Sequence, residues 1–414
     1  MAGIKKFNNL IGRIILQKIF KTAIVGGGAA GLLSAVELLS GEGALKGEDV
    51  VILEKNDRVG KKLIATGNGQ GNLTNVNMDK QYFYGDKDFV SAFIKQEKEL
   101  DLKSYLEKFG VPLTVSKDGK VYPLSKQASS VLDVVRAYLE YKKCVVTTGF
   151  NVVEIKKNNG VFIIKSNDGE IISKTVVIAT GGSAAKQFGT DGSAYKMIEK
   201  LGHTRTKIYP SLVQLKTDTA KIRALKGLKE TVNVTAYSEG KKVKSASGEI
   251  LFTEFGVSGS AIFQVSAGIA DKENASLSIE FLPELNEEEI SNILYQRKKT
   301  PYIKEEDLLS GILNKRVGQA VLKTAKSLSV LDVVQALKNF TLTVTGTLGF
   351  NYAQVTRGGI KTDKINPYTM ESKIQNGVYI VGETLDVDGD CGGYNLTFAF
   401  VSGIIAARAI KKNA

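Results

Sequence analysis

The sequence is poor in the residues that build metal centres, disulfide frameworks and histidine-based active sites. Its 414 residues include two cysteines, one histidine and no tryptophan. Cys144 and Cys391 lie far apart, which argues against a disulfide framework and against a cysteine-built zinc or iron–sulfur site. A catalytic triad would have to use His203, and we expect this residue to be structural. We therefore expect no metal site and a reducing compartment, the cytoplasm.

Long apolar runs are also missing. No stretch approaches the roughly 18 apolar residues that a membrane-spanning helix needs. Residues 1–20 are basic, with apolar side chains near one helical face. We expect this extension to be a surface helix packed on the protein body, and a helix lying on a membrane surface is the alternative. A signal peptide fits poorly, because Arg13 and Lys18 interrupt the apolar residues.

The charge of the chain is one-sided. Lysine and arginine number 56 and aspartate and glutamate 43, which gives a formal net charge of +13. A lysine-rich solvated surface explains this excess, and attraction of anionic ligands or nucleic acid is the sharper interpretation. No zinc-finger, ribonucleoprotein or helix-turn-helix signature accompanies the charge. We expect a small-molecule substrate and no nucleic-acid partner, and the sequence does not indicate an oligomeric state.

Near the start of the chain, a strand, a glycine-rich turn, a helix, a second strand and an acid follow one another. Residues 22–25 predict a short buried strand, and the turn GGGAAG follows at residues 26–31. Residues 29–39 predict a helix, and the apolar residues 50–53 predict a strand that ends in Glu54. This order is typical of a Rossmann-like dinucleotide-binding unit, so we expect an α/β fold.

Each part of this unit has a physical task. Gly26 permits the tight turn, Gly28 lets the backbone approach a pyrophosphate, and Gly31 lets the helix pack close to the strand. The helix N-terminus, with Ala29 and Ala30, offers free N–H groups to phosphate. Glu54 is placed to accept hydrogen bonds from ribose hydroxyls and disfavours a 2′-phosphate, which predicts FAD or NAD rather than NADP. A glycine turn without a ligand is the alternative.

A second glycine-rich segment, LIATGNGQGNLTN, occupies residues 63–75. Its glycines leave backbone N–H groups unshielded, which suits close approach to a phosphate or a flat ring. The segment lacks the strand-to-helix context of a Rossmann turn, so we expect it to contact the pyrophosphate, ribityl or flavin half of the same dinucleotide. A polar surface loop is the alternative. The candidate cofactor residues in and before this segment are Lys55, Lys62, Thr66, Gly67, Gly69, Asn72 and Thr74.

Two later stretches also end strands in glycine. Residues 176–182, VVIATGG, predict a buried strand, and residues 378–381 predict another that ends at Gly382 and Glu383. A polar loop then leads to a helix from about Tyr394, and the start CGGYNL exposes N–H groups at the helix N-terminus. That positive end of the helix dipole would suit the pyrimidine edge of a flavin.

Taken together, these stretches resemble the YhiN-like family of bacterial FAD-dependent (NAD(P)/FAD) oxidoreductase flavoproteins. The resemblance runs from Lys21 to the C-terminus. One departure is that Gln70 and Gly71 stand where the family usually shows a basic residue and a cysteine. The matching segments are GGGAAG, ILEKN, KKLIATGNGQGNLTN, VYPLSKQASSVLD, VVIATGG, GEILFTEFGVSG, VTRGGI and VGETLDVDGDCGGYNL.

The resemblance implies a two-dinucleotide-binding-domain type of flavoprotein with an inserted β-barrel-like and small helical subdomain. We expect residues 21–200 and 342–414 to form the FAD-binding domain and residues 201–341 to form the insertion. Within the insertion, residues 201–283 alternate as in β-structure and residues 284–341 are rich in helix formers. The remaining candidate cofactor residues are Val153, Ala179, Thr180, Gly181, Gly382, Glu383, Gly392, Gly393, Tyr394, Asn395 and Leu396.

These features predict an FAD-dependent oxidoreductase that moves a hydride to or from a small organic substrate, with NADH or NADPH as a candidate reductant. The resemblance implies either reduction of a carbon–carbon double bond in a steroid-like substrate or oxidation of a small amine such as aminoacetone. A flavin-binding regulatory or RNA-associated protein and a protein that binds only NAD are the alternatives. The absence of a second GxGxxG motif and of a Cys-x-x-Cys pair argues against a disulfide reductase.

Catalytic candidates are few. Tyr394 would donate a proton or stack on the flavin, and Cys391 would tune the flavin or be a small buried residue. Arg357, in VTRGGI, would bind an anionic substrate or the flavin, or form a structural ion pair.

Overall fold

The computed structural model describes residues 18–413, which divide into two units. Unit 1 comprises Met1–Ile208 and Val355–Ala414, and unit 2 is the continuous stretch Tyr209–Gln354. Residues 1–17 of the basic extension lie outside the described residues. The first strand, β1 (Ile19–Val25), begins three residues before the predicted strand and takes up the end of that extension.

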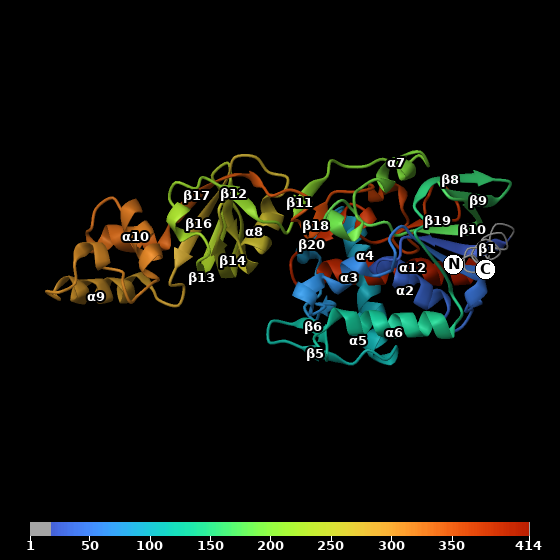
Figure 1. Ribbon diagram of the computed structural model, residues 1–414, viewed down its shortest axis with the longest axis horizontal. Coiled ribbons are helices and arrows are strands. Elements are labelled where there is room, and N and C mark those ends of the chain that lie inside the picture. The colour runs from blue at the N-terminus through green and yellow to red at the C-terminus, as the bar shows by residue number, and fades with distance from the viewer. Residues whose placement is uncertain (1–17, 414) are drawn as a thin grey trace, which may run out of the picture. The chain divides into compact units, whose positions relative to one another are not determined.

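Unit 1 is built on a mixed sheet with strand order β7-β2-β1-β10-β9-β8, and β19 pairs with β10. Figure 1 shows β1, β10, β9, β8 and β19 of this sheet. The pairs formed by β1 with β2 and β10, by β2 with β7 and by β10 with β19 are parallel, whereas β8, β9 and β10 pair antiparallel. Residues 50–54 of β2 are all buried, as expected for a parallel strand covered on both faces. The further bounds are β2 (Val50–Glu54), β7 (Val145–Thr148), β8 (Val152–Asn158), β9 (Val161–Ser166), β10 (Glu170–Ile178) and β19 (Val378–Ile380).

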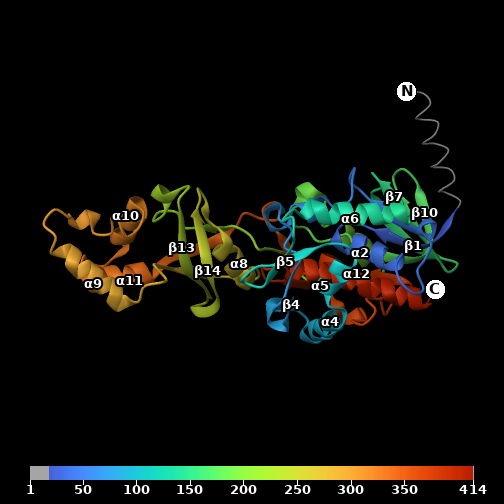
Figure 2. The same cartoon turned by 90° about the horizontal axis from the view of Figure 1, so that it is seen from below.

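Two helices that are far apart in the sequence pack closely in unit 1. Helix α12 (Tyr394–Asn413) lies alongside α2 (Ala29–Leu38), as Figures 1 and 2 show. The approach depends on glycine, because a Cβ at Gly403 would collide with the carbonyl of Ala30. Ser34 also donates to the Gly403 carbonyl at 3.1 Å. The remaining helices of this unit are α3 (Lys61–Ile64), α4 (Lys87–Leu100), α5 (Leu102–Lys108), α6 (Ala128–Tyr141) and α7 (Ala194–Glu199).

Short strands join parts of unit 1 that are far apart in the sequence. β4 (Phe83–Gly85) pairs antiparallel with β20 (Val387–Gly389). A three-stranded sheet has the order β3-β6-β5, formed by β3 (Thr74–Asn75), β6 (Lys120–Pro123) and β5 (Leu113–Val115). β18 (Val355–Arg357) opens the return of the chain to unit 1. These strands place the second glycine-rich segment and the C-terminal return in one unit.

Unit 2 contains a closed barrel with the order β12-β15-β14-β13-β16-β17. Burial alternates along β16, so one face of the strand supplies the core. The helical part begins with a capping box, in which Asn286 and Glu289 satisfy each other's backbone N–H groups. The bounds are β11 (Tyr209–Ser211), β12 (Leu215–Thr217), β13 (Lys229–Ser238), β14 (Lys241–Phe252), β15 (Gly256–Ser258), β16 (Ala275–Phe281), β17 (Phe340–Thr347), α8 (Ser260–Ile269), α9 (Glu287–Lys298), α10 (Lys315–Thr324) and α11 (Val330–Lys338).

The unit boundaries differ from the expected ones. Strand β17 pairs with both β12 and β16 and so belongs to the barrel, although the expected boundary at 341/342 assigns most of it to the FAD-binding domain. The barrel needs this last strand, because without it β12 and β16 would have unpaired edges. The chain therefore enters unit 2 at Tyr209 and leaves it after Gln354.

Within residues 18–413, the structure has no helix that is both long and apolar enough to cross a membrane.

Candidate functional site

The first glycine turn gives its three glycines three different surroundings. Gly26 has a φ of +108°, and a Cβ there would collide with the carbonyl of Ala179, the residue that follows the neighbouring strand β10. A Cβ at Gly31 would collide with the Gly26 carbonyl, so this glycine allows the helix to pack against the turn. By contrast, a Cβ at Gly28 would meet no atom of residues 18–413 within 4 Å. Gly28 therefore borders open space, as a residue that faces a bound pyrophosphate must.

The N-terminus of α2 has its N–H groups available for an anion. Among the described residues, no side chain caps this helix at Gly28, and its first turn contains no acid. The first N–H groups of a helix have no partner inside the helix and carry a partial positive charge. The start at Ala29 and Ala30 therefore fits a phosphate group.

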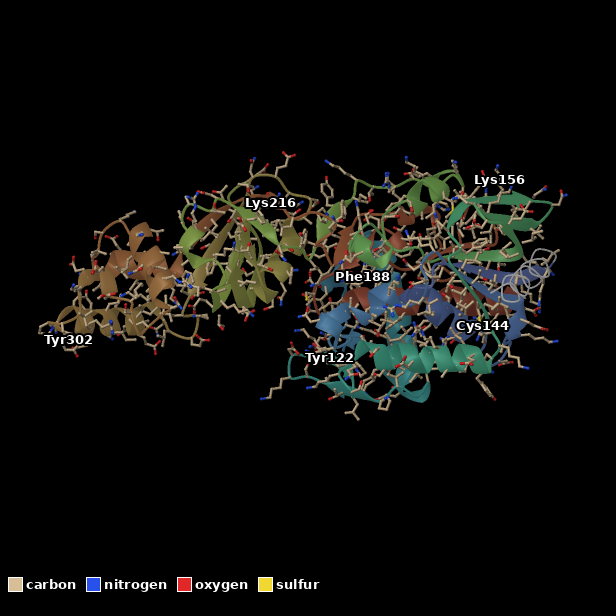
Figure 3. All side chains as sticks on the ribbon, viewed as in Figure 1. Tyr122, Cys144, Lys156, Phe188, Lys216 and Tyr302 are labelled. Atoms are coloured by element: carbon tan, nitrogen blue, oxygen red, sulfur yellow. The ribbon has the colours of Figure 1, made fainter. Side chains whose placement is uncertain are left out.

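Glu54 lies at the end of β2 with only 7% of its surface exposed. One carboxylate oxygen accepts from the Gly27 N–H at 2.9 Å, and the other accepts from the backbone N–H and side-chain amide of Asn56 at 2.8 and 2.7 Å. Asn56 also donates to the carbonyl of Phe188, which Figure 3 labels. These bonds fix the carboxylate beside the turn, where ribose hydroxyls would meet it.

The two candidate lysines have different surroundings. Lys62 donates to Glu383 at 2.6 Å and to the Ala184 carbonyl at 3.4 Å, so the structure brings together two predicted cofactor residues that are 321 positions apart. Lys55 instead pairs with Asp191 at 3.0 Å near the surface.

Sequence reasoning missed Thr356, although the VTRGGI segment contains it. Its hydroxyl accepts from the N–H groups of Ser183 and Ala184 at 2.8 and 2.9 Å. Its own N–H donates to Glu383 at 2.9 Å. Thr356 is 1% exposed and thus fixes both the loop after β10 and the Glu383 carboxylate. The available signal was a threonine close to two glycines in the VTRGGI segment.

The second glycine-rich segment is a tight turn. Gly67 and Asn68 both have left-handed backbone angles, with φ of 57° and 54°. Thr66 donates its hydroxyl to the Leu63 carbonyl at 2.7 Å, and Gly69 also has a positive φ. At Gly71, where the family usually has cysteine, φ is +74° and a Cβ would lie 3.0 Å from the Cα of Ala128.

This segment is bonded to the start of α12. With its amide oriented to satisfy both atoms, Asn72 accepts from the Gly393 N–H at 3.1 Å. Asn75 donates to the Gly392 carbonyl at 3.0 Å, and the Thr397 hydroxyl donates to the Thr74 hydroxyl at 2.8 Å. The segment therefore holds the glycines before α12 in place, in addition to the cofactor contact expected from its own backbone N–H groups.

Tyr394 packs inside unit 1. Its ring stacks on Tyr82 with centroids 4.6 Å apart and meets Phe83 edge-on. Its hydroxyl donates to the Asn77 carbonyl at 3.4 Å, and burial raises its pKa well above the ordinary value. This geometry favours a packing role for Tyr394 over proton donation.

The rest of the predicted loop is held by Asn395. Its side chain accepts from the Gly389 N–H at 2.8 Å and donates to the Gly389 carbonyl at 2.7 Å. Leu396 and Cys391 are partly buried. The Gly382 N–H donates to the Ser402 hydroxyl of α12 at 3.0 Å, which fixes the end of β19 against the same helix.

Other predicted residues border this region. Ala179 is buried beside Gly26, and a Cβ at Gly181 would approach the Thr190 side chain. The Thr180 hydroxyl lies 3.4 Å from that of Thr384. Val153 is 45% exposed at the start of β8, so a cofactor contact by this residue would come from its backbone.

Arg357 forms a structural ion pair, one of the roles considered for it. Its guanidinium donates to both carboxylate oxygens of Asp388 at distances of 2.9 to 3.2 Å. The guanidinium also lies 3.7 Å from the ring centroid of Tyr84.

His203 is buried, and its Nε2 lies 3.0 Å from the Ser372 hydroxyl. Burial lowers its pKa. Across residues 18–413, no three side chains of histidine, cysteine, aspartate or glutamate gather in a group that could hold a metal ion.

FAD fits the residues that the structure gathers. The open space at Gly28, the uncapped start of α2 and the fixed Glu54 suit the ADP half of the cofactor. Lys62, Glu383 and the start of α12 come from segments that would face its other half.

Comparisons with known proteins agree with this reading. Residues 20–409 match the family described as HI0933-like protein Rossmann domain. A 3-dehydro-bile acid delta(4,6)-reductase of Clostridium scindens is 33% identical over 94% of this chain and 98% of its own length. A ribosomal RNA dihydrouridine synthase of Haemophilus influenzae is 28% identical over 96% of this chain and 100% of its own. The structure of a 3-ketosteroid-delta4-(5alpha)-dehydrogenase from Rhodococcus jostii RHA1 matches 96% of this chain and 98% of its own with a TM-score of 0.50 at 14% identity, which shows the fold.

The family match confirms the predicted resemblance and the predicted Rossmann-like FAD-binding domain. The chain therefore belongs to the HI0933-like family, and it is an FAD-dependent oxidoreductase.

Proposed function

We propose that the protein reduces a carbon–carbon double bond that is conjugated to a carbonyl group in a steroid-like small molecule. The observation that carries this proposal is the 33% identity to the bile acid reductase across nearly the whole of both chains. A double bond next to a ketone accepts hydride at its far carbon, because the carbonyl oxygen takes up the negative charge. The neighbouring carbon then takes a proton.

FAD, once reduced by the electron donor, would supply the hydride when it is bound. Glu54 and the start of α2 would hold the ADP half, because one accepts hydrogen bonds and the other donates them. The Lys62–Glu383 pair would lie beside the middle of the cofactor. The positive end of the α12 dipole would favour the anionic reduced flavin.

NADH or NADPH is the proposed electron donor. An anaerobic absorption spectrum before and after addition of either nucleotide tests this step. We expect a flavin band that is bleached by one of them. A flavin band that neither nucleotide changes would contradict the donor, and a protein without recoverable flavin would contradict the cofactor.

The substrate is tested by reoxidation of the bleached flavin under the same conditions. We expect a 3-oxo steroid with a double bond at carbon 4 to restore the band, and the saturated 3-oxo steroid to leave it unchanged. A Gly28→Ala variant, expected to fold but to retain less flavin, is the matched control. Bleaching of the oxidised protein by aminoacetone instead would identify an amine oxidase.

A second candidate is reduction of uracil in ribosomal RNA, and two observations favour it. One relative is a ribosomal RNA dihydrouridine synthase, and the double bond lost in dihydrouridine is also conjugated to a carbonyl. The net charge of +13 is concentrated in unit 1, which has 38 basic and 27 acidic residues, against 18 and 16 in unit 2. Restoration of the flavin band by an rRNA fragment, weakened by salt, would favour this candidate over the steroid.

A further inference from the structure

Three distant segments of unit 1 meet at one buried ion pair. Arg357 ends β18, Asp388 lies at the centre of β20, and Tyr84 lies at the centre of β4. Asp388 and Tyr84 are direct partners in the β4–β20 ladder, so their side chains share a face. Arg357 binds the carboxylate with two nitrogens and stacks on the ring. One guanidinium thus joins β18, β20 and β4.

The ion pair is buried enough for each charge to depend on the other. The Asp388 side chain is 1% exposed and the Arg357 side chain 12% exposed. A buried carboxylate without its counter-charge is strongly unfavourable, because the protein interior solvates it poorly. Removal of either charge therefore changes the electrostatic field around β20 and loosens the strand.

β20 leads directly to the start of α12. Five residues, from Gly389 to Gly393, separate Asp388 from the first residue of the helix. Both ends of this loop are fixed, because Asn395 binds Gly389 and Asn72 binds Gly393. The charge on Asp388 therefore lies at the base of the loop that presents the α12 N-terminus.

We propose that Arg357 is a positioning residue for the cofactor, which acts through Asp388 to hold the start of α12 and to neutralise the negative charge beneath it. This inference rests on the proposed cofactor position at that helix start. Without Arg357, the Asp388 carboxylate opposes the helix dipole and disfavours the anionic reduced flavin. Without the carboxylate, the guanidinium favours the reduced flavin. The two losses therefore act in opposite directions.

The experiment measures the midpoint potential of bound flavin in Arg357→Gln, in Asp388→Asn and in the double variant. We expect the midpoint potential of Arg357→Gln to be more negative than that of wild type and the potential of Asp388→Asn to be more positive. Each shift is expected to correspond to about a tenfold change in the equilibrium constant for flavin reduction. A tenfold change is about 30 mV for a two-electron couple. The double variant is expected to return close to wild type. Arg357→Lys, which keeps the charge, is expected to stay close to wild type even where it loses stability.

The matched control is Lys411→Gln. Lys411 pairs with Glu37 at 2.8 Å, and both side chains are no more than 10% exposed. This pair lies at the other end of α12, which spans about 30 Å at 1.5 Å per residue. We expect a lower melting temperature for this variant and an unchanged potential.

Shifts of the same sign in both single variants, or no shift in either, would overturn the proposal. The flavin content of each variant is measured first, because a wild-type protein without flavin would contradict the proposed function instead. If Arg357→Gln does not fold, Asp388→Asn and Arg357→Lys still test the proposal. Only a charge effect makes the midpoint potential of Asp388→Asn more positive and leaves the potential of Arg357→Lys unchanged.

Discussion

The hydroxyl of Thr397, in the last helix, donates to the hydroxyl of Thr74, in the second glycine-rich segment, at 2.8 Å. The two residues are 323 positions apart, and both are buried. Together with the bond between Asn75 and Gly392, this contact shows what the second segment does in the structure. It supports the start of α12, whereas the sequence predicts a cofactor contact for each of these two segments.

Replacement of Thr74 by valine is expected to lower the free energy of unfolding by about 1 to 2 kcal/mol, because the buried Thr397 hydroxyl loses a partner. The measurement is denaturant unfolding of the apoprotein. The double variant Thr74→Val, Thr397→Val is expected to be less destabilised than the sum of the two single changes. Strict additivity would mean that the two hydroxyls do not stabilise each other.

Gly31 and Gly28 have different roles in the first turn, and alanine substitutions separate them. Gly31→Ala is expected to destabilise the fold by about 2 to 4 kcal/mol, because the added methyl group collides with the Gly26 carbonyl. Gly28→Ala is expected to keep the melting temperature of the apoprotein and to weaken FAD binding at least tenfold, because its Cβ enters the open space. Flavin release on dilution measures the second effect. If both changes had equal effects on flavin binding and on stability, the two glycines would not have separate roles.

Glu54→Arg is expected to weaken FAD retention at least tenfold, about 1.4 kcal/mol, because the change removes the acceptor beside the turn and places a cation there. Fluorescence of released flavin measures this loss. Glu170→Arg, at a side chain that is 46% exposed on β10, is the matched control and should retain FAD. Retention by Glu54→Arg equal to that of the control would exclude the ribose role.

Glu97 predicts a pH dependence of stability. Burial on α4, with the charge of Asp101 as a smaller cause, raises its pKa to about 7 from an ordinary 4.5. The folded state therefore holds a proton that the unfolded state has lost between these values, so stability falls as the pH rises from about 4.5 to about 7. Glu97→Gln should melt higher than wild type at pH 8 and close to it at pH 4. Glu99→Gln, at an exposed position on the same helix, should show no such difference.

The elements around the first turn were predictable from the sequence, because local patterns determine them. The strand, turn and helix appear within three residues of their expected bounds, and Glu54 ends β2. Buried parallel strands are continuous apolar runs, and glycine spacing identifies the turn without knowledge of distant residues.

The unit boundary was not predictable in the same way. Residues 341–347, TLTVTGT, alternate threonine with other residues and so have the pattern of a half-buried strand. That pattern does not say which sheet the strand joins, and it pairs with β12, over 120 residues earlier. Pairing between distant strands depends on the whole barrel, which local periodicity does not reveal.

A structural ion pair was one of the roles expected for Arg357, but the sequence did not identify its partner. Its partner Asp388 and its stacking partner Tyr84 lie on strands of three residues each. Strands of three residues are too short to show an alternating hydrophobic pattern, so their pairing cannot be predicted from the sequence.

The division of unit 1 between both ends of the chain has a consequence for biosynthesis. Unit 2 is one unbroken stretch, so all its strands are synthesised before β19 and α12. A nascent chain that stops before Tyr394 has the glycine turn and Glu54 but lacks the helix that Asn72, Thr74 and Asn75 support. The fold of unit 1 can therefore be completed only after the whole of unit 2 has been synthesised.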